Sequence, residues 1–316
     1  MGQAIGTYSH SRIIPETDFK VTPTSPSVYE IPFNSNGVSS SQNTTAPGTM
    51  TGRRDPVEPI LGNIDLAGDI VGPVDTNALG YILACAFGKP TTTGDATKGY
   101  IHVFKPSAKQ PSFEIEKDFG NGIVSLSKGC KISKLSFAFG GDGELTYTAS
   151  VMGCDETLGS TALSSSPTIV KMNRLNNFQA ALLIDGEETA ISTQVTLDID
   201  FGLDESGYAI GGNGFRSRIN EGNLGVSGQL TAFFDDKSFV DKAINSTKTA
   251  IQIKLTKGTE SLTIDVPEVL FARQTPGIDG ATGITQQLNY NGFYASNELN
   301  TSVQFTLANS IATYPF

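Results

Sequence analysis

Two pairs of carboxylates have a spacing that could bring acid–base chemistry to a β-sheet. Glu114 and Glu116, and likewise Asp198 and Asp200, lie two residues apart in segments that alternate like strands, so each pair faces one side of its strand. The two carboxylates of a glycosidase come instead from different elements, at a defined separation. The pattern therefore favours a solvated acidic face over a catalytic site.

Other residues that carry chemistry are sparse and far apart. His10 and His102 have no cysteine or acidic pair nearby at metal-ligand spacing, and alternation places His102 on the polar face of its strand. The glycine-rich runs 140–143 and 280–283 follow no strand–loop–helix pattern that would cradle a phosphate. The sequence offers no nucleophile–base pair. We therefore predict no enzymatic activity, no catalytic residue, no cofactor and no metal.

Composition narrows the class of protein further. The chain of 316 residues has a net charge of −10, which disfavours a basic surface that reads nucleic acid. Three cysteines at wide spacing fit neither a disulfide framework nor a zinc site, so free thiols are expected. There is no signal peptide and no apolar run long enough to span a membrane, which predicts a cytosolic protein without membrane association. Abundant Thr, Ser and Gly and few amphipathic helical runs predict an all-β fold.

One stretch of the chain occurs twice. Gly62, Asn63, Gly68 and Asp75 find the same residue types 160 positions later, at Gly222, Asn223, Gly228 and Asp235. Each copy reads as a strand that ends in an Asp, followed by a short helix. Asp75 or Thr76 is expected to cap a helix over 77–87 that ends at Gly88, and Asp235 is expected to cap a helix over 237–244. The repeat predicts two related folds in tandem.

The remaining elements follow from alternation. Residues 1–27 lack any period and read as an N-terminal arm, while 34–50 is polar enough to be a flexible loop. Expected strands occupy 28–33, 100–105, 112–117, 131–139, 144–152, 193–201, 249–255, 261–266, 284–289 and 301–309, and 140–143 forms a hairpin turn. The segment 28–33 resembles 193–201. We therefore predict a first repeat over 28–170 with a long loop at 34–58, and a second over 171–316 with a loop at 206–220.

These features resemble the tail tube, or major tail, proteins of long-tailed bacteriophages. The segments that carry the likeness are GNIDLAGDIVGPVDTNALGYILACAFG (62–88), YIHVFK (100–105), PSFEIEKDF (111–119), SKGCKISKLSFAF (127–139), residues 195–236 and SVQFTLAN (302–309). The resemblance implies β-sandwiches, each with one short helix, whose strands join those of neighbouring subunits in a ring-shaped β-barrel. Stacked rings would form the siphovirus tail tube through which DNA is ejected.

The resemblance also implies partners and a location. The chain would bind copies of itself, as a homotrimer with pseudo-sixfold symmetry if both repeats enter one ring, or as a homohexamer. Tape measure, tail terminator and distal tail or baseplate proteins would be further partners. Genomic DNA would pass without specific binding. The protein would be assembled in the host cytoplasm and reside in the virion.

Charged residues suggest where such contacts lie. An acidic wall repels phosphates and lets a duplex slide, so candidate lumen-facing residues are Glu30, Glu114, Glu116, Asp198 and Asp200. Arginines in the two equivalent loops are candidates for contacts between rings: Arg53, Arg54, Arg216 and Arg218. For each set, an ordinary solvated surface is the alternative reading.

A carbohydrate-binding or adhesin module from a virion surface is the main alternative function, since such modules are also rich in Thr, Ser and Gly. The chain has no Trp, and this lack of an aromatic platform disfavours that alternative. A hydrolase on a β scaffold is disfavoured because no nucleophile–base pair is present.

Overall fold

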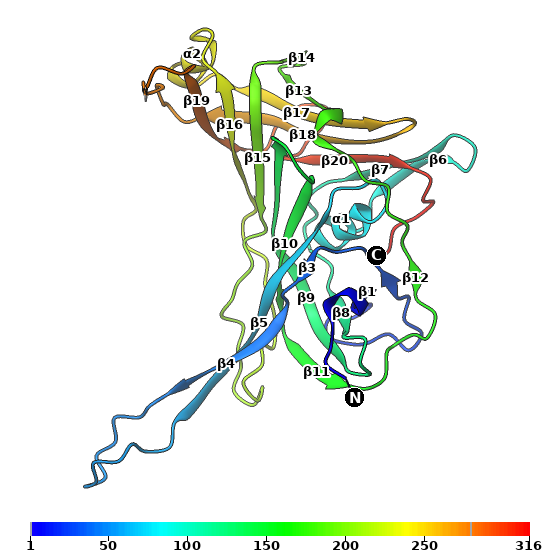
Figure 1. Ribbon diagram of the computed structural model, residues 1–316, viewed down its shortest axis with the longest axis vertical. Helices are drawn as coiled ribbons and strands as arrows, with labels where there is room; N and C mark the ends of the chain where they lie inside the picture. The colour runs from blue at the N-terminus through cyan, green and yellow to red at the C-terminus, as the bar shows by residue number, and fades with distance from the viewer. Residues whose placement is uncertain (1, 279) are drawn as a thin grey trace.

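The computed structural model describes residues 2–278 and 280–316. Strands dominate this part of the chain, with two α-helices and two short 3-10 turns, Gly6–Tyr8 (η1) and Asn177–Gln179 (η2). The molecule is elongated, with one hairpin that projects far beyond the body (Figure 1). The predicted all-β class is confirmed.

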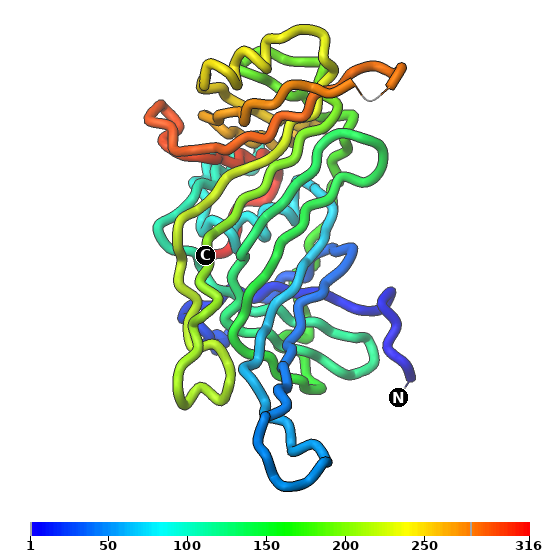
Figure 2. Tube along the Cα trace, turned by 90° about the vertical axis from the view of Figure 1, so that its left-hand side faces the viewer, coloured from blue at the N-terminus to red at the C-terminus, as the bar shows by residue number. Residues whose placement is uncertain are grey.

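A central sheet runs the length of the body, and its strands lie side by side in Figure 2. Its spatial order is β3/β4–β5–β10–β9–β15–β16–β19–β18. The strands are Ser35–Asn36 (β3), Ser39–Thr45 (β4), Ile60–Pro73 (β5), Val124–Gly140 (β9), Thr146–Gly153 (β10), Ser192–Asp200 (β15), Gly225–Phe233 (β16), Glu260–Phe271 (β18) and Thr285–Gly292 (β19). All of these pairings are antiparallel.

Two smaller sheets pack behind the central one and are joined to it by the long strands β9 and β18. The upper sheet adds Thr91–Asp95 (β6), Gly99–Phe104 (β7), Ala180–Ile184 (β13), Glu187–Glu188 (β14), Thr249–Lys257 (β17) and Gln304–Asn309 (β20). The lower sheet adds His10–Pro15 (β1), Tyr29–Glu30 (β2), Phe113–Asp118 (β8), Asp155–Gly159 (β11) and Thr168–Ile169 (β12). Together the three sheets enclose one apolar core.

The helix Leu79–Phe87 (α1) lies inside that core. All nine of its residues are buried, as expected for a helix that is apolar on every side. Asp75 Oδ1 accepts backbone N–H bonds from Asn77, Ala78 and Leu79, at 2.8, 2.5 and 3.1 Å. Gly88 ends the helix with a φ of 88°. The cap and stop predicted from sequence are confirmed, although the helix begins at Leu79.

The second helix, Ser238–Ile244 (α2), sits at the upper end of the molecule (Figure 1). Asp236, not Asp235, accepts the N–H of Ser238, at 2.7 Å. The predicted cap is therefore off by one residue. The predicted order of strand, Asp cap and helix holds in both copies.

The two copies share a strand register. β5 pairs with β10 from Leu66↔Gly153 to Pro73↔Thr146, and β16 pairs with β19 from Val226↔Gly292 to Phe233↔Thr285. Shifts of 160 and 139 residues therefore carry every pair of the first ladder onto a pair of the second. The same 139-residue shift carries Ile132↔Val151, between β9 and β10, onto Phe271↔Tyr290, between β18 and β19.

The strand preceding each copy follows the same rule. Asn36↔Ile70 and Ser39↔Ala67 map onto Val195↔Leu230 and Asp198↔Ser227 with shifts of 159 and 160. Residues 35–41 thus occupy the position of β15. The predicted correspondence of 28–33 with 193–201 is wrong, because only two residues of that segment form a strand, in the lower sheet.

The matched glycines have the same steric cause. A Cβ on Gly68 would lie 2.3 Å from the carbonyl oxygen of Gly37, and one on Gly228 would lie 2.1 Å from that of Thr196. Gly37 and Thr196 are equivalent under the 159-residue shift. Close approach of the preceding strand therefore requires glycine at both positions.

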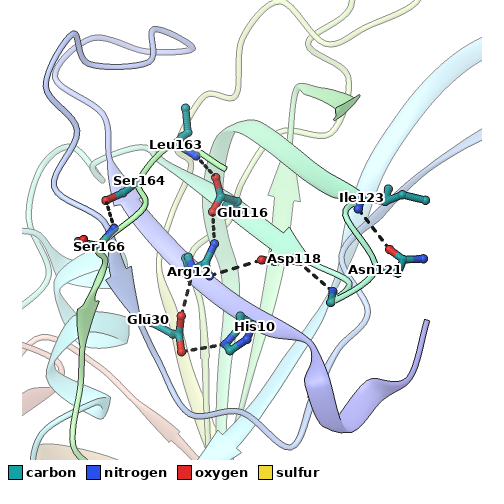
Figure 3. Close-up of polar contacts among 11 residues, drawn as sticks. His10, Arg12, Glu30, Glu116, Asp118, Asn121, Ile123, Leu163, Ser164 and Ser166 are labelled. Atoms are coloured by element: carbon teal, nitrogen blue, oxygen red, sulfur yellow. Dashed lines mark hydrogen bonds and ion pairs between the residues drawn. The ribbon is translucent and has the colours of Figure 1, made fainter. Parts of the chain in front are cut away.

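The predicted N-terminal arm contains a core strand. Ile13 and Ile14 of β1 are fully buried, and β1 pairs with β8 along its whole length. Arg12 of β1 is buried among carboxylates: Glu30 at 3.0 Å, Glu116 at 2.7 Å and Asp118 at 3.5 Å (Figure 3). Sequence alternation missed β1 because HSRIIP does not alternate: its four central residues, including Ser11 and Arg12, are all buried.

Other differences concern length. Residues 34–50, expected to be a flexible loop, include β3 and β4, because the longer strand β5 offers them a hydrogen-bonding partner. β9 begins seven residues before its predicted start, at Val124.

The three cysteines are free, as predicted, and all three are buried.

Asp75 generates a pH prediction. Burial raises its pKa from 3.8 to about 6, against the opposing effect of its three backbone hydrogen bonds. Because the folded-state pKa lies above the unfolded value, the folded chain binds this proton more tightly, and Asp75 contributes more stability as pH falls from 7 to 4. Relative to Asp75→Asn, the wild type should gain about 2–3 kcal/mol over that range, measured by urea denaturation.

Asp236→Asn serves as the control, because that cap is exposed and hydrogen bonds from Ser238 lower its pKa. The wild type should show no such gain relative to the control variant between pH 7 and 4. Parallel stability curves for the wild type and Asp75→Asn would contradict the prediction.

Arg12 generates a stability prediction. Arg12→Ala leaves the buried carboxylate of Glu116 without its cation, so the free energy of unfolding should fall by about 3–5 kcal/mol. The exposed pair of Lys134 and Asp198, at 3.0 Å, is the matched comparison. Lys134→Ala should cost at most about 1 kcal/mol. Equal effects of the two substitutions in urea denaturation would refute the structural role of Arg12.

Candidate assembly surfaces

The central sheet has one apolar and one polar face. Its inward side chains, such as Leu135, Leu197 and Leu230, are fully buried in the core. The opposite side, here called the outer face, carries mainly hydroxyls, amides and carboxylates from six strands: Asp65, Asp69, Lys134, Ser136, Thr148, Ser150, Thr196, Asp198, Asp200, Ser227, Gln229, Gln287, Asn289 and Asn291. Four aspartates outnumber the two cations that pair with them, Lys134 and Arg216, so this face is acidic.

Asp198 and Asp200 lie on the outer face, on the strand β15. Asp198 accepts the Ser136 hydroxyl at 2.5 Å and pairs with Lys134 at 3.0 Å, across to β9. Asp200 is exposed and accepts the N–H of Gly202 at 2.8 Å. These two candidates occupy a surface that could form a channel wall.

Sequence reasoning missed Asp65 and Asp69 of β5, which share the outer face. Asp69 accepts the Ser150 hydroxyl at 2.6 Å, and its position four residues from Asp65 puts both on one side of the strand. The alternation around Leu66 and Ile70, both buried, was the signal that could have identified them.

The three glutamates predicted to face a lumen lie elsewhere. Glu114 and Glu116 of β8 are buried; Glu114 accepts the Thr22 hydroxyl at 2.6 Å, and burial raises its pKa. Glu116 accepts from Arg12 and from the N–H of Leu163. Because buried carboxylates present no charge to a channel, the prediction is wrong for both. Glu30, in β2, is partly buried and binds Arg12 and His10.

The hairpin of β4 and β5 projects far below the body (Figures 1 and 2). Every residue of β4 is exposed, and Arg53 and Arg54 lie exposed near the hairpin tip, residues 46–59. This hairpin is the largest protrusion of the molecule. Its position suits contact with another molecule beyond the lower end of the sheet.

The loop 204–220 is equivalent in position to that hairpin but folds back on β5. The N–H of Ile64 donates to Gly214 O at 2.8 Å. Arg216 is 4% exposed and bonds to Asp65 at 2.5 Å and to the carbonyl of Gly153 at 3.2 Å. These partners lie within the chain, so the prediction that Arg216 contacts another ring is wrong. Arg218 is exposed.

The prediction that His102 lies on the polar face of its strand is also wrong. His102 is fully buried, with Nδ1 2.8 Å from Thr92 Oγ1 and Nε2 2.8 Å from Ile311 O, so alternation misplaced it. His102 shares the buried face of β7 with Phe104 and lies under the C-terminal segment, whereas Ile101 on the opposite face is 45% exposed. Within residues 2–278 and 280–316, no group of three or more His, Cys, Asp or Glu side chains could hold a metal. No helix in the same ranges is long and apolar enough to cross a membrane.

Both ends of the central sheet leave strand edges open. In the described part of the chain, β3 and β4 pair with β5 alone. At the far end, β18 pairs with β19 only from Val269 to Phe271 and then leads into Ala272–Ile278, which forms no strand and is mostly exposed, so among the described residues the rest of β19 has no partner strand on that side. Open edges present backbone N–H and C=O groups that can pair with another chain. The acidic face, the hairpin and the two edges therefore offer surfaces for assembly.

Comparison with known proteins agrees with this organisation. No curated protein matches the chain. A family model described as "Phage tail tube protein" matches residues 9–292, which include β1, both stretches of matching sequence (62–75 and 222–235) and the whole central sheet. The chain therefore belongs to the phage tail tube protein family.

Proposed function

We propose that this structural protein of the phage virion polymerises into stacked rings that form the conduit for DNA ejection. The observation that carries the proposal is the central sheet. It is apolar on one face and acidic on the other, and over the part of the chain that the structure describes it has edge segments without a partner strand at β3 and β4 and at β19. Closing such a sheet with other copies would remove the edges and turn the acidic face toward a common axis.

The chain is proposed to contain two tandem copies of the tube fold. The shared register of β5–β10 and β16–β19 supports duplication, as do the equivalent positions of Gly68 and Gly228. A ring with six fold units would then need three chains. We propose this homotrimer with pseudo-sixfold symmetry in preference to a homohexamer. The boundaries proposed for the two copies are 28–170 and 171–316.

The β4–β5 hairpin is proposed to join successive rings. Its polar tip can order against the neighbouring ring, and Arg53 and Arg54 can pair with carboxylates there. Tape measure, tail terminator and distal tail or baseplate proteins would meet the inside and the two ends of the tube. The DNA would pass without specific binding, since aspartates repel phosphates.

Shortening the hairpin tests the contact between rings. Replacing residues 46–59 with Asn-Gly should leave a folded protein that forms rings but not long tubes, because the tip lies outside the core. Negative-stain microscopy measures tube length, and circular dichroism checks the fold.

Arg218→Glu, on the loop that folds back, is the matched control for Arg53→Glu with Arg54→Glu. The double variant should shorten tubes and the control should not. Tubes of normal length from the shortened hairpin would eliminate it as the stacking element.

Charge reversal tests the orientation of the outer face. Asp198→Lys with Asp200→Lys should preserve tubes but slow DNA ejection on the order of tenfold, because new cations hold phosphates. Ejection is timed by fluorescence of released DNA from phage carrying the variant. Glu187→Lys with Glu188→Lys, exposed on β14 away from the outer face, is the control. Equal ejection rates for the two variants would place the outer face outside the channel.

A further inference from the structure

The junction of β9 with β15 shows how one repeat of this chain meets the next. Seven consecutive pairs join the strands, from Gln194↔Gly140 to Asp200↔Lys134. β9 is the last strand of the first repeat's part of the sheet, and β15 is the first strand of the second. Among the lateral contacts of the central sheet, this one joins strands of different repeats. It can therefore serve as a template for contacts between copies.

We propose that Ala272–Ile278 of one copy adds as an antiparallel strand to the outer edge of β3 and β4 of the next copy, in the register that β9 has on β15. The proposal rests on the proposed function, since it needs rings of identical chains. It specifies the partner, the two edges and the residues that face each other.

The register follows from the shifts already described. The 159-residue shift places Ser39 where Asp198 lies, and the 139-residue shift places Thr275 where Ser136 lies. Ser39 of one copy should therefore face Thr275 of the next. By the same rule Asn36 faces Ile278, and Ser41 faces Arg273.

Up to Ala272, the second repeat already has the strand register of the first. The N–H of Ala272 donates to Asn289 O at 2.7 Å, and these residues correspond to Ser133 and Ser150. In the first repeat, Ser133 O goes on to accept the N–H of Phe201 at 2.9 Å. The equivalent bond between copies would run from the N–H of Gln42 to Ala272 O.

The exposure of Ala272–Ile278 fits a strand position that is not filled within the chain. Ile278 is 80% exposed, whereas Phe139, its counterpart in β9, is 3% exposed. Arg273 takes the place of Lys134, so a cation is kept at the start of the strand. Pro276 lacks an N–H and would forgo one ladder bond. The remaining backbone groups of the segment stay available for pairing.

In a chain that is not assembled, side chains cover the outer edge of β3 and β4. Lys117 Nζ donates to Val38 O, and the N–H of Ser40 donates to Glu156 Oε2 at 2.9 Å. Val38 and Ser40 correspond to Leu197 and Ile199, which face β9 in the template. An arriving strand would replace these side-chain bonds by backbone bonds. Charged side chains that cover an edge are a known means of preventing premature pairing.

Disulfide trapping tests the register in assembled protein. In the template, the Ser136 hydroxyl lies 2.5 Å from Asp198 Oδ1, so cysteines at the equivalent positions fall within disulfide reach. Ser39→Cys with Thr275→Cys, both at exposed sites, should cross-link between chains under mild oxidation. On a non-reducing gel the ladder should end at three chains. The native cysteines are buried, and cross-linking of protein that carries only these cysteines gives the background.

Two controls accompany the matched pair. Ser136→Cys with Asp198→Cys should form a bond within one chain, which shows that the oxidation reaches this geometry. Ser39→Cys with Ile278→Cys is three residues out of register, about 10 Å along the strand, and should not exceed the background.

Microscopy of the same samples separates the two proposals. If tubes form but the matched pair stays uncross-linked, or the shifted pair cross-links instead, the register is overturned and the proposed function stands. A ladder that reaches six cross-linked chains also overturns the proposed register. In a ring of six chains the contact between copies would have a different angle from the β9–β15 contact within a chain, so that contact could not be its template. Chains that form neither rings nor tubes overturn both proposals.

Discussion

The hydrogen-bonding demand of strand edges is the constraint on which this structure depends. Eight strand positions lie in the central sheet, and the strands β5, β10, β9, β15 and β16 pair with a neighbour on each side. At the two ends, within residues 2–278 and 280–316, β3 and β4 have a partner on one side only, and β19 pairs with β18 over three residues only. One end is covered by side chains of Lys117 and Glu156, and the other continues into an exposed, irregular segment. Assembly is the general solution to such an edge.

The back of the sheet is built to resist deformation. The helix α1 is buried on all sides, and Asp75 fixes its first turn through three backbone bonds. Below it, Arg12 ties β1 to β2 and β8 through three carboxylates. A buried ion cluster adds little net stability but penalises any arrangement that separates its members. The sheet is thus held in one shape while its edges stay available.

Acidic residues divide between these two environments. Those of the lower sheet neutralise a buried arginine and serve the fold, whereas those on the outer face bond mainly to hydroxyl groups, as Asp69 does to Ser150 and Asp198 to Ser136. Asp198 also pairs with Lys134, and Asp65 pairs with Arg216, so two cations accompany four aspartates. A face of this kind suits a surface past which a polyanion moves, because it offers phosphates few cations to bind.

The sequence by itself determined the strand class, the repeat, the Asp75 cap, the Gly88 stop and most strands with strict alternation, such as β15. These features are local, since propensity, capping and period-2 patterning act over a few residues. It also placed Asp198 and Asp200 on a polar strand face and matched Gly68 with Gly228, where the preceding strand leaves no room for a Cβ.

Tertiary structure alone decided which polar residues are buried. Glu114 and Glu116 read as solvated because alternation reports the face of a strand, not whether another layer covers it. His102 proved to lie on the core face of β7, and Arg216 is buried because its loop folds onto β5. The strands β1, which does not alternate, and β4, which is wholly polar, are not recognised without their partners β8 and β5. Strand register, and with it the correspondence of β3 and β4 with β15, depends on contacts between residues far apart in sequence. Those contacts exist only once the sheet has formed.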